Sequence, residues 1–287
     1  MWSVAEPYIS RTENKIMRED LINFKHYYLV NAAKVPADSF FRQSMNHKYK
    51  HSIDVLHWGK KILQNTPELT GVSDEFICYA EQALLFHDVG RFDEAVMRFE
   101  AAQKGNLTAE VLAQFDHGLI GYNLLKNNPR YNDFRILFAV RYHGKMMDDV
   151  KASVMWQEVQ NSPQKDEILQ IFYLVRDADK MANFQAAKNH NHLKEDIFYK
   201  QLTDVAKTAP LSENVKTQFF AGKVILSSTI TTFADRLLQV LSWIYDFNYQ
   251  YTRTVFLKDG CAQFLFDELA KYHTNENELQ KIREKVF

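Results

Sequence analysis

Six polar side chains in the first two thirds of the sequence are of the types that bind transition metals, and they are His51, His87, Asp88, His117, His143 and Asp179. Imidazole nitrogens together with carboxylate oxygens suit borderline divalent ions such as Mn, Fe, Co, Ni or Zn, and suit thiophilic ions poorly. Such an ion lowers the pKa of a bound water and polarises a phosphoryl oxygen, so hydrolysis is the chemistry within reach of this set. The six residues are far apart in the chain, so elements of secondary structure must bring them together.

Capping residues predict the helices that position these side chains. Ser73, followed by Asp74 and Glu75, is expected to begin a helix that stops at Gly90. Ser162, with Pro163 at the first helical position, begins another that carries Asp179. The remaining helices that concern the six residues are expected over roughly 46–65, 108–127 and 132–144. The aromatic-rich last hundred residues are also expected to be helical.

Four of the histidines lie on the apolar stripes of their predicted helices. An α-helix turns by about 100° per residue, so residues three, four, seven and eleven apart share a face. The stripes hold Val55, Trp58 and Ile62 beside His51; Phe76, Ala80, Ala83 and Leu84 beside His87; Ile120, Gly121 and Leu124 beside His117; and Ile136, Ala139 and Val140 beside His143. A single inward histidine indicates core packing, but four favour a shared centre, because a buried imidazole needs partners for both ring nitrogens. His47, one turn before His51, is ambiguous.

The two aspartates are placed by the same geometry. Asp88 projects about 100° round the helix from His87, so both could approach one ion while the second carboxylate oxygen bridges to another. On the helix near 168–182, Asp179 projects within about 50° of the centre of the apolar face, measured around the helix axis, whereas Asp177 projects about 150° away from it. We therefore expect Asp179 to point inward, and Asp177 to be solvated or paired with Arg176 or Lys180. A local distortion of the helix would exchange the two.

The composition predicts an all-α protein with a substantial core. Of 287 residues, 46% are hydrophobic, whereas glycine and proline number only 9 and 6, so long stretches lack helix breakers. We expect an N-terminal helical segment at 1–44, a metal-binding helical core at 45–190 and a C-terminal helical extension at 191–287 packed on that core.

The charge balance and the two cysteines limit the partners and the compartment. A formal net charge of -1 provides no general field for nucleic acid or for an acidic membrane surface, so a small ligand is the expected partner. Cys78 and Cys261 are too few for a disulfide framework, which suits a reducing compartment. The first residues lack the continuous apolar run of a signal peptide. We expect a soluble, cytoplasmic protein, and a homo-oligomer is compatible with the sequence.

The order of these residues resembles the HD-domain superfamily of metal-dependent phosphohydrolases. The similar segments are "HSIDVLHWGKKI", "LLFHDVGRF", "HGLIGYNLL", "AVRYHGK" and "LVRDADKMA", which lie between residues 47 and about 185. The resemblance implies an HD-domain-like helical bundle with the metal at its centre. Arg91 differs from the lysine that many members carry there, and "DADK" leaves the register of the final aspartate open.

The resemblance implies one or two divalent transition-metal ions, with Mg also compatible. His51, His87, Asp88 and Asp179 match the ligands of mononuclear members, and His117 and His143 match the additional ligands of dinuclear members. Asp88 could bridge two ions or bind a single one, and the sequence leaves both open. We expect Arg91, Lys145 and Lys180 to contact substrate phosphate. Asp88 and Arg91 are the expected catalytic residues. Asp93 and Glu94 are weaker acid–base candidates, since helix-surface carboxylates are common.

The expected activity is cleavage of a phosphomonoester, a phosphodiester or a nucleotide by a metal-activated water. Three alternatives stay open. The same ligand set serves di-iron oxygenases of this superfamily, a sensing module could bind metal or nucleotide without turnover, and the histidines could be core residues only. Metal content and phosphate release distinguish these possibilities.

Overall fold

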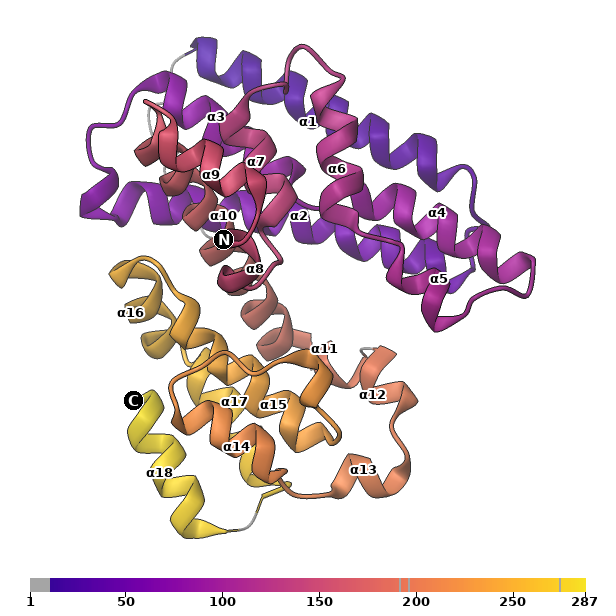
Figure 1. The fold of residues 1–287 in the computed structure, drawn as a ribbon, viewed down its shortest axis with the longest axis vertical. Coiled ribbons are helices and arrows are strands. Elements are labelled where there is room, and N and C mark those ends of the chain that lie inside the picture. The colour runs from indigo at the N-terminus through magenta and orange to yellow at the C-terminus, as the bar shows by residue number, and fades with distance from the viewer. Residues whose placement is uncertain (1–10, 191, 196, 274) are drawn as a thin grey trace, which may run out of the picture. The chain divides into compact units, whose positions relative to one another are not determined.

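The structure, a computed structural model, describes residues 11–190, 192–195, 197–273 and 275–287 (Figure 1). Every regular element within these ranges is a helix, so the all-α prediction is confirmed. None of the described helices combines the length and the apolar character needed to cross a membrane. The chain divides into two compact units, the first ending at Ala178 and the second beginning at Asp179. This division falls within one helix, α10, whereas the boundaries expected from the sequence were at 44/45 and 190/191.

The first unit contains the predicted metal-binding segments. Its helices are α1 (Arg11–Ala32), α2 (Phe40–Asn65), α3 (Asp74–Phe86), α4 (Gly90–Gln103), α5 (Ala109–Ala113), α6 (His117–Lys126), α7 (Phe134–Tyr142), α8 (Met147–Lys151), α9 (Val154–Asn161) and the first half of α10 (Lys165–His190), with a short 3-10 helix, η1 (Pro67–Leu69). Helix α2 packs against α3 and α4, α6 packs against α4 and α7, and α3 packs against α7. His51 lies on α2 and His117 on α6, while His87 and His143 directly follow α3 and α7.

Capping explains most of the helix starts. Ser73 caps α3 by accepting a hydrogen bond from the Phe76 amide, and Thr108 caps α5 in the same way. The sequence predicted one helix over 108–127, but Asp116 provides a second cap that divides this stretch into α5 and α6. Gly90 was expected to end a helix, and this prediction is wrong. Helix α3 ends at Phe86, and Gly90 is the first residue of α4.

Aromatic side chains fill the core of the first unit. Phe24 of α1 lies 5.5 Å from Phe86 of α3 and 5.4 Å from Phe92 of α4, measured between ring centroids. Phe86 also lies 4.4 Å from Tyr131, which is fully buried. A buried carboxylate, Asp20, accepts hydrogen bonds from Arg130, Tyr131 and Gln82, and so ties α1 to the segment after α6. The N-terminal helix is therefore part of this core.

The second unit continues from α10 and is built from shorter helices: α11 (His192–Glu195), α12 (Ile197–Gln201), α13 (Asp204–Thr208), α14 (Glu213–Phe220), η2 (Ser227–Thr229), α15 (Phe233–Ser242), η3 (Trp243–Asp246), α16 (Gln250–Lys258), α17 (Cys261–Ala270) and α18 (Glu276–Val286). Helix α15 packs against α14 and α17. Phe184 of α10 lies 4.4 Å from Phe256 and 5.6 Å from Trp243, so these aromatic residues pack within the unit.

Candidate metal centre

The carboxylate of Asp88 lies between four histidines of the first unit. His51 Nε2 is 3.9 Å and His87 Nε2 is 3.6 Å from Asp88 Oδ2. His117 Nε2 and His143 Nε2 are each 3.4 Å from the other oxygen, Oδ1. The structure therefore brings together five of the six predicted residues, with the four imidazoles placed two at each oxygen of the Asp88 carboxylate.

Helix ends orient two of these imidazoles. His87 is the C-cap residue of α3 and His143 is the C-cap residue of α7. The last carbonyls of a helix lack partners further along the helix, so side chains near the end can use them. His87 Nδ1 bonds to the Leu84 carbonyl at 2.9 Å, and His143 Nδ1 bonds to the Val140 carbonyl at 3.0 Å. A carbonyl only accepts, so Nδ1 carries a proton, and Nε2 is the ring nitrogen that faces Asp88.

His117 reaches the centre from the start of a helix. It is the first residue of α6, directly after the cap Asp116. The backbones of α4 and α6 lie very close together beside His117. A Cβ built on Gly90 of α4 would lie only 2.1 Å from the His117 carbonyl oxygen. Only glycine fits at this crossing. Burial lowers the pKa of His117 well below its usual value despite the opposing charge of Asp88, so its ring is neutral near pH 7 and can bind metal.

The nitrogen and oxygen atoms around the Asp88 carboxylate are suited to bind a cation. His143 Nε2 is 3.3 Å from His117 Nε2 as well as 3.4 Å from Asp88 Oδ1. Asp88 Oδ1 is buried, and His117 Nε2, His143 Nε2 and Arg91 Nε lie 3.4–3.5 Å from it, which is longer than an ordinary hydrogen bond. Lone pairs that converge in a buried place are stabilised by a shared positive charge. One ligand atom each from His87, Asp88 and His143 lie within 4.8 Å of one another, so this group could hold a metal ion.

The sixth predicted residue, Asp179, lies on α10 directly after Ala178. Asp179 is the first residue of the second unit, whereas His51 and His87 belong to the first, so its place among the ligands stays a prediction. Asp177 was expected to be solvated or paired with Arg176 or Lys180; its exposed fraction of 0% excludes solvation, and the pairing stays a prediction. Helix α10 is buried on every side from Ile171 to Ala178 except at Tyr173, so its apolar pattern could not separate an inward face from an outward one.

Lys48 is a residue of the centre that the sequence did not reveal. Its ammonium nitrogen lies 2.8 Å from Asp88 Oδ2, and its side chain is 24% exposed. Burial alone raises the pKa of Asp88, but the surrounding positive charge, that of Lys48 above all, holds this pKa well below its usual value. The available signal was the spacing between Lys48 and His51, three residues apart on one helix and hence on one face.

Arg91 lies where the sequence placed it, beside the centre. Its Nε is 3.5 Å from Asp88 Oδ1, and its guanidinium donates to Glu94 at 2.8 Å. Glu94 is buried and also pairs with Arg98, so it positions two arginines. These ion pairs account for the burial of Glu94, which had been considered as an acid or base.

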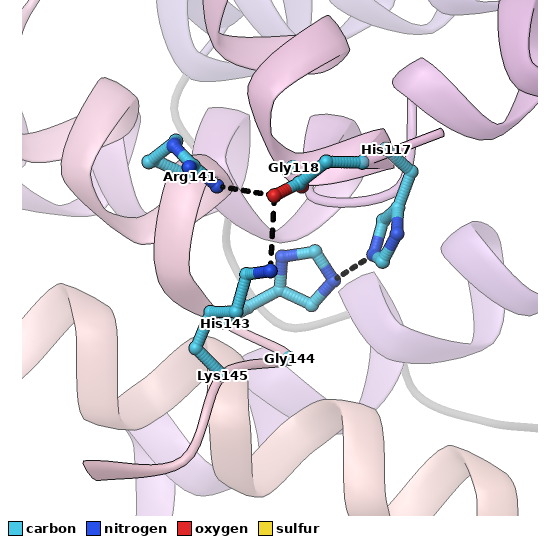
Figure 2. A pocket seen from close by; sticks show the side chains of 7 residues that line it. His117, Gly118, Arg141, His143, Gly144 and Lys145 are labelled. Carbon is cyan, nitrogen blue, oxygen red and sulfur yellow. Dashed lines mark hydrogen bonds and ion pairs between the residues drawn. The ribbon is translucent and has the colours of Figure 1, made fainter. Parts of the chain in front are cut away.

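A pocket opens beside His117 and His143. It has about 240 Å³ of empty space, partly open to solvent, and is lined by Asp116, His117, Gly118, Arg141, His143, Gly144 and Lys145. Figure 2 shows His117 and His143 facing each other at this pocket. Arg141 and Lys145 both pair with Asp116 Oδ2, at 3.0 and 2.9 Å. Lys145 therefore lines the pocket and is held there by Asp116.

Two other basic residues of α10 have defined partners. Arg176 is buried and donates to the carbonyls of His143 and Lys145, at 2.9 and 2.6 Å, so it fixes the segment that follows α7. Lys180 forms an ion pair with Asp246 at 2.8 Å within the second unit.

Comparison of the chain with protein-family models, curated proteins and solved structures gives no match. Its function is therefore inferred from the residues of the centre.

Proposed function

We propose that this protein is a metal-dependent phosphohydrolase of the HD-domain type that cleaves a phosphomonoester, a phosphodiester or a nucleotide. The observation that carries the proposal is the Asp88 carboxylate with two imidazoles at each oxygen. His51, His87, Asp88 and Asp179 would hold one divalent ion, and Asp88, His117 and His143 would hold a second. Divalent ions in such a site activate water and polarise a phosphoryl oxygen.

The chain's own residues supply the rest of the proposed reaction. Asp88 is kept ionised, so it is available as a ligand at neutral pH. The carbonyls of Leu84 and Val140 keep the Nε2 lone pairs of His87 and His143 directed at the centre. Arg91 lies beside Asp88, and Lys145 lines the pocket. We propose that both side chains bind the negatively charged phosphate of the substrate.

The proposal is tested by metal analysis of protein purified without chelator, together with release of inorganic phosphate from a panel of phosphoesters and nucleotides. The parent should hold between one and two equivalents of a transition metal, His117→Ala about one and Asp88→Ala close to none. His57→Ala is the matched control, because His57 is an exposed histidine on α2 and should change nothing.

Three outcomes would contradict the proposal. A parent with less than about half an equivalent of metal, and no activity after addition of Mn or Ni, would indicate core histidines. Aerobic turnover that needs iron and oxygen and releases no phosphate would indicate an oxygenase. Tight nucleotide binding with intact ligand recovered after long incubation would indicate a sensing module.

A further inference from the structure

Lys48 and the histidines of the proposed first ion meet the same carboxylate oxygen. Lys48 Nζ is 2.8 Å from Asp88 Oδ2, and His51 and His87 approach that oxygen at 3.9 and 3.6 Å. Lys48 lies on α2 one turn before His51, so a single helix presents both a cation and a ligand to Oδ2. The ammonium is thus already at the oxygen that a metal ion would use.

A divalent ion and an ammonium group compete for one carboxylate oxygen. Asp88 is almost completely buried, and a buried carboxylate needs a compensating charge. An ion between His51, His87 and Oδ2 would supply that charge and would also repel the ammonium. Lysine suits an exchange of this kind, because its charge sits at the end of a flexible stem, and the side chain of Lys48 is already partly exposed.

We propose that Lys48 is the counter-charge of Asp88 when the centre holds no ion, and that it leaves Oδ2 when an ion binds. Lys48 is in this sense a positioning residue that holds the ligand carboxylate ready and weakens the affinity for metal. The inference rests on metal binding at the proposed centre and is independent of the reaction catalysed there.

The experiment is a titration of metal-free protein with Co²⁺, followed by the visible absorption of the bound ion. Lys48→Met should bind Co²⁺ about tenfold more tightly than the parent, since one charge-assisted hydrogen bond no longer opposes binding. Lys48→Arg retains the charge and should bind like the parent. Lys50→Met is the matched control, because Lys50 is an exposed lysine on the same helix. Unchanged or weaker binding by Lys48→Met overturns the inference.

A second measurement uses the parent alone, so it decides the question even if Lys48→Met fails to fold. Acetylation of lysine amines is followed by site-resolved mass spectrometry with and without Co²⁺. Labelling of Lys48 should increase relative to Lys50 when Co²⁺ is added, and equal labelling overturns the inference. A parent that binds no Co²⁺ contradicts the metal centre itself. A parent that binds Co²⁺ but releases no phosphate contradicts only the proposed reaction.

Discussion

Substitution of Gly90 by alanine tests whether the crossing of α4 and α6 sets the geometry of the centre. The added Cβ would lie 2.1 Å from the carbonyl oxygen of His117 and 2.6 Å from the amide nitrogen of Gly121. Ordinary contact begins near 3.4 Å, so α6 must move by about 1.3 Å, because both obstructing atoms belong to the backbone. A shift of this size would break the 3.4 Å approach of His117 Nε2 to Asp88.

The expected result is a combined loss of stability and of one ion. Overpacking of this kind costs about 1–3 kcal/mol, which lowers the melting temperature by about 2–12 °C in a domain of this size. Metal content should fall to the single ion held on the His51 and His87 side. Gly71→Ala is the control, because Gly71 has a φ of 78° but a Cβ added there would meet no atom within 4 Å, so this variant should lower stability and leave the metal content unchanged. A Gly90→Ala variant with parental stability and both ions would refute the reasoning.

Three further predictions concern the surroundings of the centre. Asp179→Asn should lose the ion on the His51 side while Asp177→Asn retains it, as measured by metal analysis, and the reverse result would identify Asp177 as the ligand. Arg176→Met removes a donor from the carbonyls of His143 and Lys145 and should lower the free energy of unfolding in urea by at least about 2 kcal/mol. Burial raises the pKa of Asp116, but hydrogen bonds from Lys145 and the Leu119 amide and the charge of Arg141 outweigh burial and lower this pKa from 3.8 to about 2. The stabilisation by Asp116 is therefore complete above pH 4 and is lost as the pH falls towards 2, so the stability difference between parent and Asp116→Asn should shrink over that range. A difference that stays constant with pH would contradict this pKa.

The fold class and most of the centre could be predicted because local rules extend to the helix ends. His87 and His143 are C-cap residues, yet their backbone angles remain helical, with φ near -52° and -51°. The rotation of 100° per residue therefore still gave the correct direction for both side chains. The low content of glycine and proline likewise predicted helices, and Ser73 and Thr108 cap helices as expected.

Gly90 and the solvation of Asp177 were predicted wrongly, and Lys48 was missed, because each depends on tertiary contacts, which a local sequence pattern does not reveal. Gly90 was interpreted as a helix stop, whereas its role is to allow the backbones of α4 and α6 to approach, and that contact joins residues far apart in the chain. Solvation of Asp177 was one expectation because the apolar pattern of α10 was taken as one-sided, but α10 is buried on every side from Ile171 to Ala178 except at Tyr173. Lys48 was missed because a lysine by itself indicates solvent, and only the tertiary structure brings its ammonium to Asp88.

The four histidines lie on α2 and α6 and at the C-terminal ends of α3 and α7. Successive histidines are joined by roughly 30 residues of chain, so a shared centre would act as a cross-link. Each loop closed by an ion removes conformational freedom from the unfolded chain, as a disulfide does in proteins that have one. The two cysteines of this chain are both free, and Cys261 is buried. A metal centre of this kind would therefore also stabilise the helical bundle as a cross-link. Removal of the ion should lower the stability of all four helices together.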